Sequence, residues 1–279
     1  VQTAAEKIAA HRGQSPIVLL SGPSGSGKTT TAMKIEDALE AMGVETHTVS
    51  MDNYFNTIDP ETAPRNREGA IDYESPFCLD IELLNRHFAM LDRGETIHVP
   101  KYEFARQMRS DIMSQPMHLG EDEIAIFEGI HALNDIIIGK NPNAFKLYIA
   151  ARSNVVDDGK VIFDHAWLRL CRRIVRDHKF RGSNAEFTMK MWDNVRRGEK
   201  LYISPYKENA DLMFDSSLAC EFSVLKPYVV PLLEELPRGK YPVADQILEA
   251  YEKIEGMDDT YLAPNSLARE FVGGSTYTY

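Results

Sequence analysis

Residues 22–29 have the sequence GPSGSGKT, which fits the pattern G-x-x-x-x-G-K-[ST]. The motif follows the apolar run at residues 16–20 (PIVLL), which predicts a buried strand. It precedes residues 28–42, where apolar side chains at helical spacing predict an amphipathic helix that ends at Gly43. Glycines in such a loop allow backbone N–H groups to converge on phosphate oxygens, and the start of the helix adds further donors. Motif and context together predict a phosphate-binding loop (P-loop).

The P-loop supplies the predicted nucleotide-binding residues. Lys28 can reach the β- and γ-phosphates of a nucleotide, and the hydroxyl of Thr29 can bind Mg²⁺. The alternative is a glycine-rich turn with an incidental lysine, which the flanking strand and helix disfavour. The residues predicted to bind the nucleotide are Gly22, Ser24, Gly25, Ser26, Gly27, Lys28, Thr29 and Thr30.

Strands and helices alternate along the rest of the chain. Periodicity predicts helices at residues 79–91 and 163–174, a long loop at 56–75 and one arm of a hairpin at 96–104. Alternating strands and helices are typical of an α/β fold with a parallel sheet flanked by helices, here the P-loop NTPase fold. The predicted strands are residues 16–20, 44–50, 123–130, 145–150 and 210–215, of which the first, third and fourth are expected to be buried.

Composition excludes several classes of protein. The 279 residues include 31 basic and 42 acidic side chains, a net charge of −11, which disfavours a general nucleic-acid binder. No apolar run approaches the roughly 20 residues that span a membrane. Cys78, Cys171 and Cys220 lie far apart and form no CxxC motif, which argues against a disulfide framework or a zinc cluster. We therefore expect a cytoplasmic protein.

Charge is concentrated in one basic segment. Residues 165–200 contain ten Lys or Arg and four Asp or Glu, a local charge of +6 in an acidic chain. A cationic segment of this kind indicates a local anionic ligand.

Two acidic residues follow predicted strands and favour a kinase. Glu128 ends the strand EIAIFEGI and is expected to hold Mg²⁺, whereas Asp52 follows the second strand in VSMDNYF. A carboxylate at the position of Asp52 can orient an acceptor hydroxyl and take its proton. Each could instead be a helix-capping or turn residue. The NKxD and DxxG motifs of switch GTPases are absent after the second strand.

Five sequence blocks resemble uridine/cytidine kinases of the phosphoribulokinase and uridine kinase family. The blocks GPSGSGKTT, VSMDNYF, VPKYEFARQMR, IFEGIHAL and RLCRRIVRDHKFRG occur in the order seen in that family, and the similarity covers about residues 15–217. The resemblance implies transfer of the γ-phosphoryl group of ATP or GTP, with Mg²⁺, to the 5′-hydroxyl of a pyrimidine nucleoside.

The resemblance also implies roles for individual residues. Asp52 would be the general base, and Asp72 would hold the ribose hydroxyls. A helical lid at about residues 153–205 would close over the phosphates with Arg169, Arg173, Arg176 and Arg181, of which Arg173 and Arg176 would be catalytic. The remaining substrate-binding residues implied are Tyr54, Tyr102, Phe104, Gln107 and Arg109.

Gln107 departs from the family pattern, because it stands where the family has a histidine that contacts the base. Phosphorylation of another alcohol, such as a sugar phosphate or a modified nucleoside, therefore stays open. So does a nucleotide-sensing module with little turnover.

The expected organisation is a kinase domain at residues 1–217 and a mostly helical extension at 218–279 that packs on it. Because the chain starts at Val1, we expect a piece of a longer protein. The oligomeric state is open, with a homo-oligomer as one alternative.

Overall fold

The computed structural model describes residues 1–103, 106–110 and 116–279. The chain divides into two compact units, which are described separately. Unit 1 comprises residues 1–22, 31–148 and 197–213. Unit 2 comprises residues 23–30, 149–196 and 214–279.

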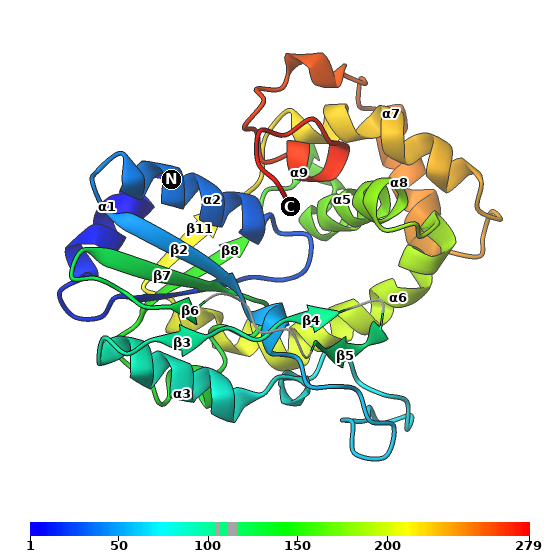
Figure 1. The fold of residues 1–279 in the computed structure, drawn as a ribbon. Helices are drawn as coiled ribbons and strands as arrows, with labels where there is room; N and C mark the ends of the chain where they lie inside the picture. Colours follow the sequence, from blue (N-terminus) through cyan, green and yellow to red (C-terminus); the bar gives the residue numbers. More distant parts are fainter. Residues whose placement is uncertain (104–105, 111–115) are drawn as a thin grey trace. The chain divides into compact units, whose positions relative to one another are not determined.

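A five-stranded sheet with the strand order β11-β8-β1-β7-β2 forms the centre of the fold (Figure 1). Strand β1 pairs in parallel with β7 and β8, and β2 pairs in parallel with β7. The predicted parallel α/β sheet is therefore confirmed. Its strands are β1 (Ile17–Ser21), β2 (Glu45–Ser50), β7 (Glu123–Glu128), β8 (Phe145–Ala150) and β11 (Leu212–Asp215).

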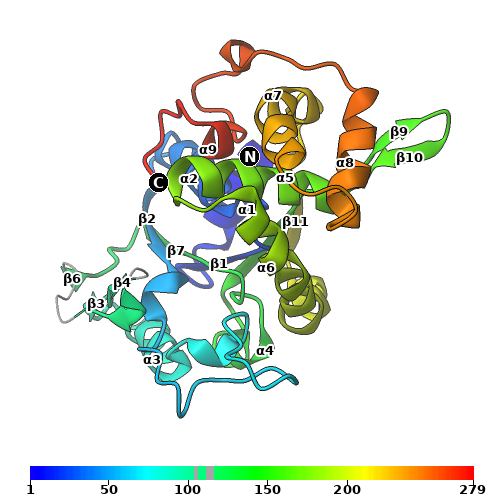
Figure 2. The same cartoon turned by 90° about the vertical axis from the view of Figure 1, so that its right-hand side faces the viewer.

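Helices cover both faces of this sheet in unit 1. Figure 2 shows α1 and α2 on one face and α3 and α4 on the other. Helix α3 packs through Phe88, whose ring lies edge-on to that of Phe127 at 4.7 Å between centroids. Helix α1 was not predicted; its buried side is only Ala4, Ala5 and Ile8, a weak apolar signal. The helices are α1 (Gln2–His11), α2 (Lys28–Glu40), α3 (Ile81–Asp92) and α4 (Asp135–Ile138).

The loop predicted at residues 56–75 contains no helix or strand and is folded by turns and one isolated bridge, between Arg65 and Ile71. It lies between two 3-10 helices, η1 (Met51–Tyr54) and η2 (Pro76–Cys78). The hairpin region forms short antiparallel pairs, β3 with β6 and β4 with β5. These strands are β3 (Ile97–His98), β4 (Tyr102–Glu103), β5 (Met108–Arg109) and β6 (Pro116–Met117).

Unit 2 is built around helix α5. Its apolar stripe, including Leu170, Cys171 and Ile174, belongs to a buried cluster shared with α7 and α8. Residues of the predicted extension thus bury α5 rather than forming a separate core. The helices are α5 (His165–Phe180), α6 (Ala185–Gly198), α7 (Glu221–Glu234), α8 (Pro242–Glu252) and α9 (Arg269–Val272), with the 3-10 helix η6 (Asp259–Tyr261). The chain then returns to unit 1, where a π-helix, η4 (Glu199–Ile203), and a 3-10 helix, η5 (Ser204–Asn209), follow α6.

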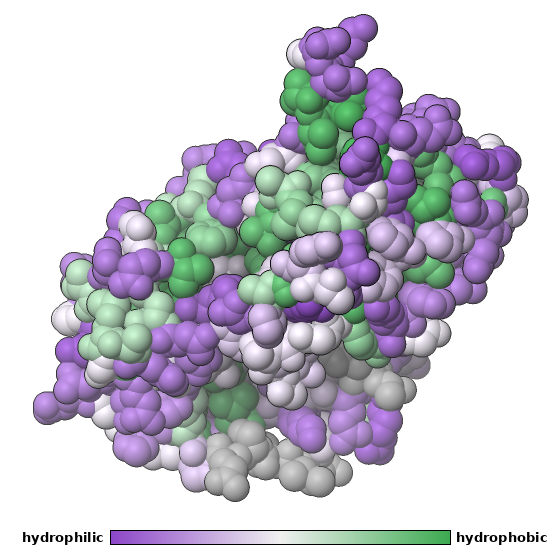
Figure 3. Space-filling model, turned by 90° about the horizontal axis from the view of Figure 1, so that it is seen from above, coloured by the Kyte–Doolittle hydropathy of each residue, from purple (hydrophilic) through white to green (hydrophobic). Residues whose placement is uncertain are grey.

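A hairpin of β9 (Val155–Asp157) and β10 (Lys160–Phe163) projects from unit 2. It stands at the top of Figure 3, where hydrophobic atoms lie below a hydrophilic tip. Val156 and Val161 are 56% and 54% exposed. Within the described ranges, no helix combines the length and apolar character needed to cross a membrane.

Candidate active site

The P-loop follows β1 and requires glycine at two positions. Gly25 and Gly27 have φ angles of +75° and +79°, in the left-handed region that favours glycine. A Cβ atom at Gly25 would lie 3.0 Å from the carbonyl oxygen of Arg169, so the helix α5 backbone also excludes a side chain there. Successive backbone N–H groups in such a loop form a concave anion-binding surface.

Two polar side chains of the P-loop fit a phosphate ligand. Ser26 is fully buried, and its Oγ has no hydrogen-bond partner in the part of the chain that the structure describes. An orphaned buried hydroxyl is costly unless a ligand or water completes it. Lys28 Nζ donates to the carbonyl oxygen of Pro23 at 3.4 Å, which folds the lysine back along the loop.

Two of the four predicted lid arginines contact the P-loop itself. Arg169 is 2% exposed, and its Nε donates to the carbonyl oxygen of Ser24 at 3.2 Å. Arg173 Nη1 donates to the hydroxyl of the same serine. Within unit 2, helix α5 therefore places cationic groups directly against the predicted phosphate-binding loop.

The other two predicted lid arginines gather at Asp177. Arg176 Nη2 donates to Asp177 Oδ1 at 2.8 Å, and a nitrogen of Arg181 lies 3.8 Å from the same oxygen. Arg173 approaches the second carboxylate oxygen at 3.8 Å. The side chain of Asp177 is 8% exposed. The sequence predicted that an anionic ligand neutralises this positive charge. The carboxylate of Asp177 already neutralises part of it.

Arg172, which the sequence analysis did not select, forms a closed ion pair. Its Nε and Nη2 donate to the two carboxylate oxygens of Glu221, both at 2.6 Å, and both side chains are 0% exposed. The guanidinium also donates to the carbonyl oxygens of Gly25 at 3.0 Å and Ser216 at 2.8 Å. Arg172 therefore supports the P-loop backbone from within the core.

In unit 1, Asp52 and Glu128 lie at the same edge of the sheet. Glu128 ends β7 and is paired in register with Leu20 of β1 and Ser50 of β2. Asp52 lies two residues beyond Ser50 in η1, and its backbone N–H donates to the Ser50 hydroxyl at 3.3 Å. The side chain of Glu128 is largely buried and that of Asp52 is half-buried. Ligands of open α/β sheets bind at this carboxyl edge.

Asp72 is buried and engaged by two side chains. Its residue is 1% exposed, and its Oδ1 accepts from Arg197 Nη2 at 2.6 Å while Oδ2 accepts from the Tyr202 hydroxyl at 3.0 Å. The hydrogen bond to Asp72 raises the pKa of Arg197, and burial followed by the bond to Asp72 raises the pKa of Tyr202. Each oxygen of this carboxylate therefore already accepts a hydrogen bond, and a carboxylate oxygen has lone pairs for more than one.

Tyr54 and Arg109 stabilise the segment that carries Asp52. Tyr54 is fully buried, its hydroxyl shares a 2.9 Å hydrogen bond with His87 Nδ1, and burial raises its pKa. Arg109 Nη1 donates to Asp80 Oδ2 at 3.0 Å, and its Nη2 donates to the carbonyl oxygen of Tyr54 at 3.2 Å. Both side chains thus hold the chain after β2 in place.

Two of the predicted base-reading residues, Tyr102 and Gln107, lie on β4 and just before β5. Tyr102 is 8% exposed, and its ring packs on that of Phe55 at 5.5 Å between centroids. Gln107 is exposed in the turn and has a φ of +51°, a strained conformation for a residue with a side chain. Phe104 lies outside the described residues.

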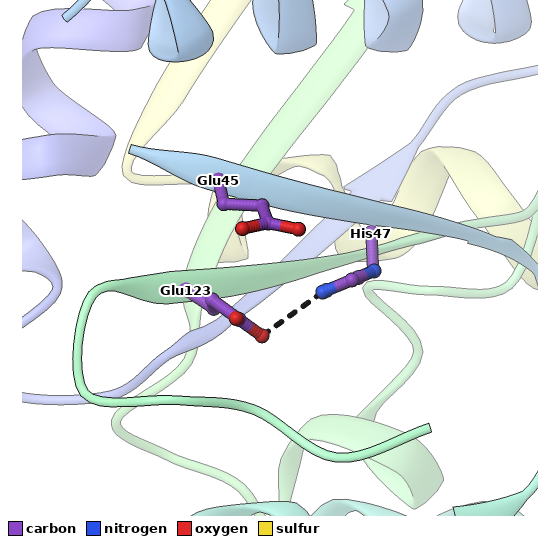
Figure 4. Close-up of side chains that lie close together, drawn as sticks. All are labelled: Glu45, His47 and Glu123. Carbon is purple, nitrogen blue, oxygen red and sulfur yellow. Dashed lines mark hydrogen bonds and ion pairs between the residues drawn. The ribbon is translucent and has the colours of Figure 1, made fainter. Parts of the chain in front are cut away.

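Another cluster of charged side chains lies at the opposite edge of the sheet (Figure 4). Glu45 and Glu123 face each other at the first residues of β2 and β7, and His47 Nε2 lies 3.0 Å from Glu123 Oε2. The ligand atoms of the three side chains lie within 4.8 Å of one another. The carboxylates of Glu45 and Glu123 are paired directly across the two strands, where like charges repel each other. Because this is the amino edge, the cluster is separate from the edge that carries Glu128.

Besides Arg172, four residues of these networks were missed by sequence reasoning: Arg197, Tyr202, Asp177 and Glu221. Asp177 was visible as the acid inside the basic block RLCRRIVRDHKFRG. The other three act over long sequence separations, and no local pattern indicates their partners.

Comparison with known proteins shows which family the chain belongs to. Residues 17–221 match the model of the phosphoribulokinase / uridine kinase family. The chain is 31% identical over 201 residues to a uridine kinase of Macrococcus caseolyticus, covering 71% of this chain and 86% of that protein. It is 29% identical to a uridine kinase of Staphylococcus aureus, covering 71% of this chain and 86% of that protein.

A uridine kinase of Saccharomyces cerevisiae is 26% identical over 201 residues, which cover 72% of this chain but 36% of the yeast protein. Among solved structures, a provisionally named fructose transport system kinase of Silicibacter sp. TM1040 superposes with a TM-score of 0.50 at 22% identity. That match covers 71% of this chain and 88% of the other and supports the shared fold.

Proposed function

Because this chain belongs to the phosphoribulokinase / uridine kinase family, we propose that it transfers the γ-phosphoryl group of ATP or GTP to the 5′-hydroxyl of uridine or cytidine. Membership of the family makes it a P-loop kinase. The observation that carries the nucleoside part of the proposal is the 31% identity to a uridine kinase over 86% of that protein's length.

The P-loop residues are assigned to the donor. Lys28 neutralises charge on the β- and γ-phosphates, and the buried Ser26 hydroxyl gains the hydrogen bond that it otherwise lacks. We assign Thr29 and Glu128 as metal ligands, because each carries an oxygen of the kind that Mg²⁺ prefers. Bound Mg²⁺ would draw charge from the phosphate oxygens.

Asp52 is assigned as the general base. It takes the proton of the acceptor 5′-hydroxyl as that oxygen bonds to the γ-phosphorus and the bond to the β-phosphate oxygen breaks, which leaves ADP or GDP. Asp72 orients the ribose through its 2′- and 3′-hydroxyls. Its carboxylate is fixed for this task by Arg197 and Tyr202.

Arg173 and Arg176 are assigned to the charge that develops on the transferring phosphoryl group. Arg169 and Arg181 complete the cationic face of the proposed lid. The contact of Arg173 with Ser24 supports this assignment, since it ties the arginine to the phosphate-binding loop.

Gln107 supports a second candidate function, phosphorylation of another alcohol such as a sugar phosphate. It replaces the base-contacting histidine of the family and lies exposed with a left-handed backbone. A glutamine amide can pair with a pyrimidine edge, but it pairs equally well with other polar groups.

We further propose a cytoplasmic location. Cys78, Cys171 and Cys220 are free thiols, which suits a reducing compartment. A homo-oligomer stays one alternative for the assembly.

ADP release across a panel of acceptors tests the proposal. The panel contains uridine, cytidine, adenosine, fructose, ribulose 5-phosphate and glycerate, each with ATP or GTP and Mg²⁺. We expect turnover with the two pyrimidine nucleosides. Turnover with a sugar or sugar phosphate alone would support the kinase activity and contradict the proposed nucleoside substrate. No turnover with any acceptor, despite ATP binding, would favour a sensing module.

A further inference from the structure

The C-terminal segment, residues 262–279, lies outside the family match yet contacts the P-loop within unit 2. Figures 1 and 2 both place α9 and the chain after it beside the start of α2. Leu267 packs directly on the loop, because a Cβ atom at Gly27 would lie 2.7 Å from Leu267 Cδ1.

A carboxylate of this segment occupies hydrogen-bond donors at the start of α2. Glu270 Oε2 accepts from the Thr30 hydroxyl at 2.5 Å and from the Thr30 backbone N–H at 3.4 Å. The Tyr279 hydroxyl lies 3.0 Å from the same Thr30 oxygen. Thr30 itself is fully buried.

These donors are the kind that a nucleotide phosphate requires. The first N–H groups of a helix have no partner within the helix, and they carry the positive end of its dipole. In a P-loop they bind phosphate oxygens. Glu270 thus places an anion where the sequence motif predicts one from the nucleotide.

The anchor of the segment is separate from this contact. Phe271 and Val272 are buried, and the Arg172 guanidinium lies 5.1 Å from the centre of the Phe271 ring. Lys179 Nζ donates to the carbonyl oxygen of Val272 at 2.7 Å. Glu270 is half-buried and Tyr279 is 55% exposed. The two contacts with Thr30 can therefore be released by side-chain rotation while α9 stays in place.

We propose that Glu270 is an internal stand-in for a nucleotide phosphate: its carboxylate holds the Thr30 donors when the loop is empty, and a phosphate of the incoming donor displaces it. The inference rests on the donor half of the proposed function and is independent of the acceptor. The Thr30 hydroxyl has one proton, so it cannot donate to both anions. Two anions in one buried site also repel each other strongly.

The consequence is a lower affinity for the nucleotide. When an internal competitor occupies a site, the apparent Kd of the ligand equals the Kd of the open site divided by the fraction of molecules in which the site is open. Removing the charge of Glu270 should therefore strengthen nucleotide binding. If Glu270 instead oriented Thr30 for the nucleotide, its removal would weaken binding, so the two roles differ in sign.

Calorimetric titration with ADP, without acceptor, tests the inference. Glu270→Gln should bind ADP about tenfold more tightly than the wild type, as expected for loss of one charged hydrogen bond. Glu252→Gln, which removes an equal charge from an exposed position of α8, should bind as the wild type does. In a Thr30→Val background the gain from Glu270→Gln should disappear.

Weaker or equal ADP binding by Glu270→Gln would overturn the inference alone. Absence of ADP binding in every variant and in the wild type would overturn the donor half of the proposed function and this inference with it. Amide hydrogen exchange gives a second readout: ADP should accelerate exchange at residues 274–279 and leave residues 268–272 protected. Slower exchange at residues 274–279 would show closure over the nucleotide and contradict displacement.

Discussion

Two arginine–carboxylate pairs, one in each unit, differ in how they meet solvent. In unit 2 the side chains of Arg172 and Glu221 are both 0% exposed. In unit 1 the side chain of Asp72 is 1% exposed, whereas that of its partner Arg197 is 33% exposed. A closed pair can only support the fold, since no ligand reaches it. A half-open pair keeps its carboxylate oriented while part of the arginine side chain stays in contact with solvent.

The difference follows from what surrounds each pair. Arg172 also donates to the carbonyl oxygens of Gly25 and Ser216, so its N–H groups already have partners in the backbone of unit 2. Asp72 receives a second bond from Tyr202 and lies at the end of the long loop after β2. Removing one partner of a fully buried ion pair strongly destabilises a protein, whereas charged groups with one side toward solvent are more often found at functional sites.

Breaking the closed pair should have the largest effect. Arg172→Met leaves Glu221 buried without its partner, so we expect the free energy of unfolding to fall by about 3–5 kcal/mol. Urea denaturation measures this. Arg181→Met, which alters a 60% exposed arginine of the same region, should change stability by less than about 0.5 kcal/mol. If Arg172→Met lowers the free energy of unfolding by less than about 1 kcal/mol, the closed pair is no more structural than the half-open one.

Asp52→Asn tests the proposed general base at the carboxyl edge of the sheet in unit 1. Because the amide cannot accept the proton of the acceptor hydroxyl, kcat should fall about 100-fold or more while ATP affinity is unchanged. Steady-state kinetics and an ATP titration measure the two quantities. A collapse of ATP affinity would instead identify Asp52 as a metal-binding or structural group.

Asp72→Asn separates a binding role from a structural one at the half-open pair. We expect KM for uridine to rise about tenfold, as the charged hydrogen bonds to the ribose are lost. The change in KM should be smaller for 2′-deoxyuridine, which lacks one of the two hydroxyls. An equal change for both substrates, with a large drop in melting temperature, would make Asp72 as structural as Glu221.

An exposed network should have the smallest effect. Hydrogen bonds from Lys240, Lys190 and Tyr241 lower the pKa of Glu186 from its ordinary 4.5 to about 2. A lowered folded pKa contributes stability above about pH 4.5 that is lost as the pH falls toward 2. Glu186→Gln should lower the melting temperature at pH 7 by no more than about 2 °C. The deficit should shrink below pH 4.5, and a deficit that grows with acidification would contradict the assignment.

The parallel sheet and the P-loop could be predicted because their signals are local. The run PIVLL, the glycines at 25 and 27 and the helix that follows specify strand, turn and helix within residues 16–40. The family that five sequence blocks resemble is confirmed by the family match over residues 17–221.

The pairings of the site could not be predicted, because they depend on tertiary packing. Arg172 and Arg173 are neighbours in sequence, yet one is closed against Glu221 and the other reaches the Ser24 hydroxyl. Periodicity alone does not say which arginine of a helix faces the core. Arg197 meets Asp72 across 125 positions, and Glu270 meets Thr30 across 240. The roles of Asp52, Asp72 and Gln107 in catalysis and binding stay predictions.

The central claim, transfer of a phosphoryl group to a nucleoside 5′-hydroxyl, is tested most directly by comparing uridine with 5′-deoxyuridine. Both carry the same base and the same 2′- and 3′-hydroxyls, and only uridine offers the acceptor oxygen. With ATP and Mg²⁺ we predict that uridine gives equimolar ADP and uridine 5′-monophosphate, identified by mass, and that 5′-deoxyuridine gives neither. ADP release with 5′-deoxyuridine, or a product phosphorylated elsewhere, would contradict the account.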